Sequence, residues 1–175
     1  AGFTTLCYDG QYFIDTDHPV VDADGVTQSV SNSGGGSGNP WFLLDVSKPI
    51  KPIIYQKRSD YKFVALDNAD DPNVFHKKEY LYGVDGRCNV GYGLWQLAYG
   101  SKQTLDATNY KAARAAMSSV KGDNGRPLNV TPNLLVVGPS NEAAALELTK
   151  SERNAAGATN VFRGTAEVLV VSWLP

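Results

Sequence analysis

The sequence predicts an α+β protein, built as one domain or as two small subdomains that share a sheet. Three observations support this prediction. The first hundred residues are rich in aromatic and β-branched residues that glycines and prolines interrupt, which is typical of strands. After Gly100 the pattern changes to alternating helix and strand signals. The hydrophobic fraction of 42%, with 10% aromatic residues, indicates a chain that buries a core.

Four strands are expected before Gly100. A turn signal at Asp9-Gly10 predicts a short strand at 11–14, and apolar runs predict strands at 41–44 and 61–66, separated by a charged corner at 56–60. The longest strand is expected within 79–100, where bulky residues alternate until Leu94 and then shift to the other phase. A β-bulge or a second buried face would explain that shift, and the strand is expected to pack in the core.

Residues 24–40 form a polar tract rich in glycine and serine. Such a composition buries too little apolar surface to offset the entropy of ordering the chain, so we expect a flexible loop. No Gly-Lys-Ser/Thr sequence follows the glycines, which argues against a phosphate-binding loop.

The part after Gly100 is expected to run helix, strand, helix, strand. Asp106 is the predicted N-cap of an amphipathic helix that ends at Gly122, and 132–137 reads as a strand covered on both faces. Ser140 is the predicted N-cap of a second helix that ends at Gly157, and a last apolar strand is expected at 167–174.

The charge balance, the length of the apolar runs and the cysteine spacing argue against several kinds of partner and site. The 16 basic and 18 acidic side chains give a formal net charge of −2, which does not indicate a polyanionic partner. No apolar run approaches the roughly 20 residues of a membrane span, so no membrane partner is expected. Cys7 and Cys88 match no metal-binding spacing, and two reduced thiols in a cytosolic protein are expected rather than a disulfide.

The sequence contains no catalytic constellation. Only His18 and His76 are available as histidine bases, neither lies near a nucleophile motif, and His76 beside two lysines is expected at the surface. We therefore predict a protein that is not an enzyme, with no catalytic residue, cofactor or metal. One alternative stays open, in which Asp15, Asp17 and His18 hold a divalent metal or a small ligand. The competing interpretation is a turn, because Asp, Pro and Gly are favoured in turns.

Several segments together carry a family resemblance that runs from end to end of the chain. They are Cys7-Tyr-Asp-Gly-Gln-Tyr-Phe, Asp15-Thr-Asp-His-Pro, Trp41-Phe-Leu-Leu-Asp, Tyr61-Lys-Phe, Phe75-His-Lys-Lys-Glu-Tyr-Leu-Tyr-Gly, Gly91-Tyr-Gly-Leu-Trp-Gln-Leu-Ala and Gly164-Thr-Ala-Glu-Val-Leu-Val-Val. With them the chain resembles the major head subunit (T protein) family of Mu-like phages and prophages, whose members are major capsid proteins.

The resemblance implies a fold and a domain organisation. It implies the Hong Kong 97-type phage capsid fold in part, namely the C-terminal part of the subunit without its N-terminal arm, extended loop and spine helix. Residues 1–104 are then expected to be mostly peripheral-domain strands, with the flexible loop at 24–40. Residues 105–175 are expected to be mostly axial domain.

The resemblance also implies a function. It implies a structural subunit that self-assembles into the icosahedral head shell and encloses DNA without sequence-specific binding. Further expected partners are the scaffold and portal proteins. The expected location is the virion capsid, assembled in the cytoplasm of the bacterial host.

Overall fold

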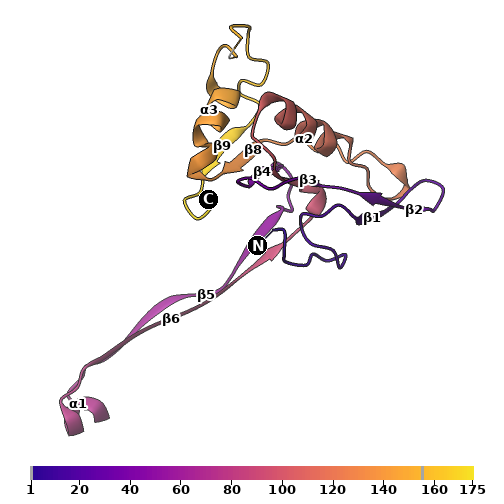
Figure 1. The fold of residues 1–175 in the computed structure, drawn as a ribbon. Helices are drawn as coiled ribbons and strands as arrows, with labels where there is room; N and C mark the ends of the chain where they lie inside the picture. Colours follow the sequence, from indigo (N-terminus) through magenta and orange to yellow (C-terminus); the bar gives the residue numbers. More distant parts are fainter. Residues whose placement is uncertain (1, 155) are drawn as a thin grey trace. The chain divides into compact units, whose positions relative to one another are not determined.

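The chain folds as two compact units in a computed structural model that describes residues 2–154 and 156–175 (Figure 1). The first unit, called the body, comprises Ala1–Pro52 and Tyr92–Pro175; the second, called the hairpin unit, comprises Ile53–Gly91. The elements mix helices and strands, which agrees with the predicted α+β class. In the described part of the chain no helix is long and apolar enough to cross a membrane.

A five-stranded sheet with the order β3-β7-β4-β8-β9 forms the centre of the body. Its strands are β3 (Ser33–Gly36), β7 (Ala98–Lys102), β4 (Trp41–Leu44), β8 (Leu134–Val137) and β9 (Glu167–Val170). β4 is antiparallel to both of its neighbours, whereas β3 pairs with β7, and β8 with β9, in parallel. Trp41 lies opposite Ser101 on β7 and Val137 on β8.

Each face of this sheet buries a separate apolar cluster, because side chains alternate along a strand. Trp41 and Leu43 face a cluster that α2 (Ala107–Ser119) and α3 (Glu142–Lys150) complete. Leu44 faces the other cluster, to which the N-terminal segment contributes Phe13 and Ile14. β4 and β8 therefore contribute apolar side chains to both clusters, as their continuous apolar sequences predict.

The predicted order helix, strand, helix, strand after residue 105 is confirmed as α2, β8, α3 and β9. Asp106 caps α2 as predicted, since its carboxylate accepts a hydrogen bond from the Asn109 N–H at 2.8 Å. The predicted cap of α3 is wrong, because Ser140 lies in the 3₁₀ turn η3 (Pro139–Asn141) that precedes the helix.

Both helices end before the glycines at which the sequence predicts their ends. α2 ends at Ser119 and not at Gly122, and α3 ends at Lys150 and not at Gly157. The side-chain amide of Asn160 satisfies the end of α3, because it donates to the carbonyls of Glu147, Leu148 and Ser151. The last strand is likewise shorter than predicted and ends at Val170.

The glycine- and serine-rich tract at 24–40 is not the continuous loop that its composition predicts. It contains β2 (Thr27–Val30), which pairs with β1 (His18–Val21), and β3, which pairs with β7. Glycine permits the second pairing, because a Cβ built on Gly36 would lie 2.4 Å from the backbone nitrogen of Gln103. The tract is thus ordered by non-local backbone pairing, which composition does not report.

The single long strand expected within 79–100 is also wrong. β6 (Leu81–Tyr92) ends before the phase shift, and the 3₁₀ turn η1 (Trp95–Leu97) separates it from β7. The shift therefore marks the change from the hairpin unit to the body, and not a bulge. The predicted strand at 11–14 is reduced to a bridge between Leu6 and Tyr12.

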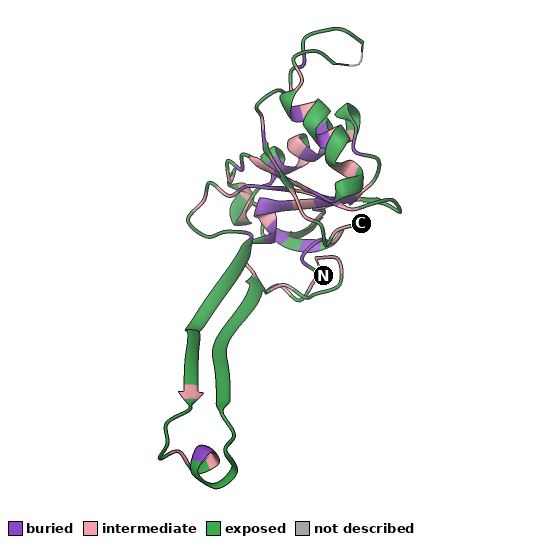
Figure 2. Cartoon of the chain, turned by 90° about the vertical axis from the view of Figure 1, so that its left-hand side faces the viewer, coloured by how far each residue is buried: buried purple, intermediate pink, exposed green. Residues whose placement is uncertain are grey.

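The hairpin unit consists of β5 (Ile53–Leu66), α1 (Pro72–Lys77) and β6, with the two strands antiparallel and side by side (Figure 1). β5 runs without interruption through the predicted charged corner at 56–60. At the tip, the Asn73 side chain donates to the carbonyls of Leu66 and Glu79 and so links the two strand ends. Almost the whole unit is exposed, except for Val74 in α1 (Figure 2).

The five-stranded sheet takes strands from both sides of residue 104, so the compact units do not divide the chain at the predicted domain boundary. The assignment of 1–104 to the peripheral domain and of 105–175 to the axial domain stays a prediction.

Candidate functional site

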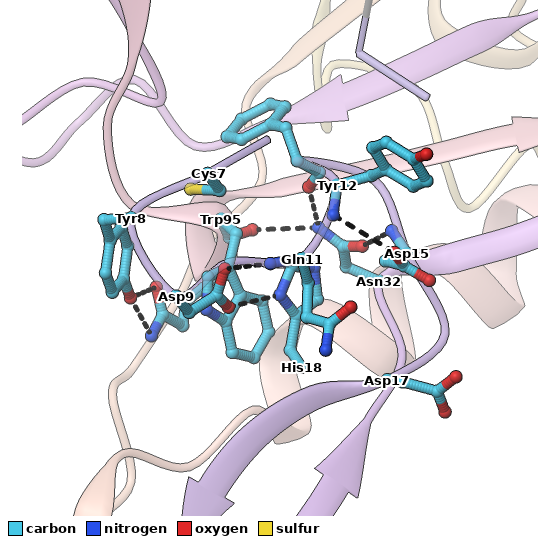
Figure 3. A network of polar contacts seen from close by, with 12 residues as sticks. Cys7, Tyr8, Asp9, Gln11, Tyr12, Asp15, Asp17, His18, Asn32 and Trp95 are labelled. Carbon is cyan, nitrogen blue, oxygen red and sulfur yellow. Dashed lines mark hydrogen bonds and ion pairs between the residues drawn. The ribbon is translucent and has the colours of Figure 1, made fainter. Parts of the chain in front are cut away.

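Asp15, Asp17 and His18, the three residues of the metal-binding alternative, form hydrogen bonds with different partners. Asp15 accepts hydrogen bonds from the backbone N–H groups of Tyr12 and Thr16. Asp17 accepts from the Ser29 hydroxyl, and its carboxylate points away from the other two side chains (Figure 3). Among the described residues no group of three or more His, Cys, Asp or Glu side chains could hold a metal ion. The geometry gives the metal-binding alternative no support.

His18 belongs instead to a buried structural cluster. Its Nδ1 lies 2.6 Å from the Asp9 carboxylate, and its ring stacks on Trp95 with centroids 4.0 Å apart (Figure 3). The ring is fully buried, and its Nε2 has no hydrogen-bond partner within the part of the chain that the structure describes. The cluster thus joins the N-terminal segment, β1 and η1.

Asn32 completes the connection between the same segments. Its side-chain oxygen accepts from the Asp15 N–H, and its amide donates to the carbonyls of Phe13 and Trp95. Sequence reasoning missed the roles of Asp9, Asn32 and Trp95, because their contacts join residues that follow no periodic pattern. The arrangement fixes backbone segments relative to one another.

The two cysteines differ in exposure. Both are free, with Cys7 partly buried and Cys88 exposed. Burial raises the pKa of the Cys7 thiol, which donates to the Gly93 carbonyl at 3.5 Å. A raised pKa keeps the thiol protonated and weakly nucleophilic. His76 is exposed in α1, as predicted.

The hairpin unit presents an aromatic and apolar face. Three contacts across the strands show which side chains share it: Phe63 stacks on Tyr82, the Tyr61 ring lies over Gly86, and Tyr55 interacts with Cys88. The face carries alternate residues of each strand, which include Ile53 and Lys57 in β5, and six of its aromatic and apolar side chains are 60% to 77% exposed. They are Tyr55, Tyr61, Phe63, Tyr82, Val84 and Val90.

The opposite face of the hairpin unit is mixed and largely charged. Between its apolar ends it carries Gln56, Arg58, Asp60 and Lys62 from β5 and Asp85, Arg87 and Asn89 from β6. A two-stranded sheet is at best marginally stable alone, and an apolar patch of this kind marks an interaction site. We therefore identify the apolar face, called the aromatic face below, as the candidate functional surface of the hairpin unit.

Comparisons with known proteins identify one family that the chain matches over almost its whole length. The family model described as "Mu-like prophage major head subunit gpT" matches residues 1–174. The Mu-like prophage FluMu major head subunit of Haemophilus influenzae is 48% identical over 162 residues, which cover 89% of this chain and 53% of the relative. The major capsid protein of Escherichia phage Mu is 38% identical over an alignment 182 residues long, gaps included, that covers 99% of this chain and 60% of the relative.

Solved capsid structures have the same fold. A chain of the procapsid of bacteriophage JBD30 superposes with a TM-score of 0.84 at 45% identity, over 99% of this chain and 60% of that chain. This chain thus spans between half and two thirds of the length of the relatives that it matches. The fold is that of a phage capsid protein, and the chain belongs to the family of Mu-like prophage major head subunits.

Proposed function

We propose that this chain is part of a structural subunit that associates with copies of itself into the icosahedral head shell of a Mu-like phage. The observation that carries the proposal is the aromatic face, whose large side chains are exposed although neither their size nor their chemistry suits water. A shell subunit covers such faces through many modest contacts in closed symmetry. The role is structural and requires no catalytic residue or cofactor.

The proposed domain assignment follows the family resemblance. β5 and β6 are the long strands of the peripheral domain within residues 1–104, and α2, β8, α3 and β9 belong to the axial domain within 105–175. The relatives are longer than this chain, and we propose that the additional length of a neighbouring copy supplies a segment that covers the aromatic face. The exposure of that face in the 175-residue chain supports this assignment.

The remaining partners and the location are proposed on the same basis. The shell encloses DNA without reading its sequence, which is compatible with a formal net charge of −2. Scaffold and portal proteins are the other proposed partners. Assembly takes place in the cytoplasm of the bacterial host, and the product is the virion capsid.

Electron microscopy of the longer protein tests the proposal. We expect capsomers or shells from a subunit of the relatives' full length. Light scattering should show no shells from the 175-residue chain, because the proposal assigns part of the contact surface to the additional length of the relatives. A full-length subunit that forms neither capsomers nor shells would contradict the proposed function.

A further inference from the structure

The body exposes one tryptophan almost completely. Trp41 and Trp95 are buried, at 0% and 1% exposure, whereas Trp173 is 96% exposed. Tryptophan carries the largest apolar surface of any side chain and is enriched among the residues that dominate binding energy at interfaces. The indole of Trp173 is therefore almost uncovered in this chain, which is the exposure expected of a side chain that a binding partner covers.

The backbone around Trp173 is fixed. The Val171 N–H donates to the Val137 carbonyl, and the Leu174 N–H donates to the Val171 carbonyl. The chain end lies so close to Gly138 that a Cβ built there would be 2.2 Å from the Pro175 oxygen. Trp173 is therefore presented on an ordered turn, and its insertion into a partner would cost little backbone entropy.

The same body contains an open apolar cleft of about 480 Å³, called the α2–α3 cleft. Its walls come from the residues around the start of α2, from α3 and from the segment that follows α3. The apolar lining comprises Leu105, Ala107, Ala144, Leu148, Val161 and Phe162. Its polar lining comprises Asp106, Glu147, Asn154, Thr159 and Asn160.

The side chain of Trp173 and the α2–α3 cleft are complementary in size and chemistry. The small side chains of Ala107 and Ala144 leave room for a flat ring. The only polar group of an indole is an N–H donor, and the carboxylates of Asp106 and Glu147 are acceptors. Trp173 does not line the cleft of its own chain, so a contact between the two joins two molecules.

We infer that Trp173 inserts into the α2–α3 cleft of a second copy of this chain. The inference rests on the proposed function and names one contact by which the copies associate. Because the anchor and the cleft are different surfaces, the contact is heterologous: each copy uses its cleft for one neighbour and its tryptophan for another. A heterologous contact generates a closed ring when the rotation between copies closes.

A complementation experiment with the 175-residue chain tests the inference. Trp173→Ala removes the anchor but keeps the cleft, and Ala144→Phe fills the cleft but keeps the anchor. Sedimentation equilibrium should show self-association of the unmodified chain, and each variant alone should associate at least about tenfold more weakly. An equimolar mixture should form one-to-one dimers, because one partner supplies the anchor and the other the cleft.

Acrylamide quenching gives an independent reading of the same contact. Trp173 is the exposed one of the three tryptophans, so its fluorescence should be quenched in the Ala144→Phe variant and protected when the Trp173→Ala variant is added. The control is Ala143→Phe, an exposed position of α3 that does not line the cleft and should leave association unchanged.

Three results would overturn the inference. The unmodified chain could remain monomeric at millimolar concentration, the mixture could remain monomeric, or Ala143→Phe could weaken association as much as Ala144→Phe. Protection of Trp173 in the monomer would identify another part of the same chain as its cover and would also reject the contact. Shell formation by the full-length protein is measured separately, so it can succeed while this contact fails.

Discussion

The imidazole of His18 stacks on the indole of Trp95, with ring planes 6° from parallel and centroids 4.0 Å apart. The Nδ1 atom of the same ring contacts the carboxylate of Asp9, and the Asp9 side chain is 8% exposed. The histidine therefore connects the N-terminal segment and β1 to the turn that precedes β7. Its contacts hold these segments together.

Replacing His18 with alanine should destabilise the body by about 2–4 kcal/mol. The change removes the stacking contact and leaves the Asp9 carboxylate without the partner that compensates for its burial. The free energy of unfolding from urea titration measures the loss. His76→Ala is the matched control, since His76 is exposed in α1, and it should stay within about 0.5 kcal/mol of the unmodified chain. Equal effects at the two histidines would contradict the structural role.

The pairing of β3 with β7 gives a prediction about two adjacent glycines. Gly35 and Gly36 both have positive φ angles, of 65° and 91°, but only a Cβ on Gly36 would collide with β7. Gly35→Ala should cost about 1 kcal/mol from the backbone conformation alone. Gly36→Ala should cost clearly more in the same unfolding measurement, because the strand must also move away from Gln103. Equal costs would show that β3 does not approach β7 this closely.

Local signals in the sequence predicted the helical half of the body best. Asp106 and the buried spacing of Tyr110, Ala113 and Met117 determine α2 to within about one turn, and the apolar run at β8 indicates a strand covered on both faces. Such signals depend on neighbouring residues only. The cap of α3 was missed because a proline-initiated 3₁₀ turn places Asn141, and not Ser140, at the helix start.

Non-local pairing explains the features that the sequence did not predict. β3 is stable because β7 supplies its partner, and β5 continues through 56–60 because both faces of the hairpin tolerate exposed charges there. The candidate surface was missed for a related reason. Alternating aromatic residues normally indicate a buried face, and only the structure shows that the aromatic face is uncovered in this chain.

Asp45 makes stability depend on pH. Burial favours a raised pKa for its carboxyl, but hydrogen bonds from the Ser47 hydroxyl and from the N–H groups of Thr131 and Ser47 outweigh burial and lower the pKa below 3.8. A lowered folded-state pKa contributes stability above the unfolded value, and this contribution is lost as the pH falls through the folded value. The loss due to Asp45 should therefore begin below about pH 4.

Asp45→Asn isolates this contribution. At pH 7 the variant should be about 1–3 kcal/mol less stable, because a buried amide replaces a carboxylate that accepts three hydrogen bonds. Below pH 4 its free energy of unfolding should fall less steeply than that of the unmodified chain. Asp67→Asn, at an exposed position, is the control and should keep the original pH profile. Parallel profiles for Asp45→Asn and the unmodified chain would contradict the assignment.

Tyr61 tests whether the aromatic face is used in assembly. The side chain is 77% exposed and lies over Gly86, where a Cβ would be 2.7 Å from its ring. Tyr61→Lys should change the free energy of unfolding of the 175-residue chain by less than about 0.5 kcal/mol, because little buried surface is lost. In the full-length protein the same change should abolish shells in electron micrographs, since an unpaired charge would be buried when the face is covered. Lys62→Ala, at the next position on the opposite face, is the control and should leave shells intact. Normal shells from Tyr61→Lys would show that this face remains exposed in the assembled particle.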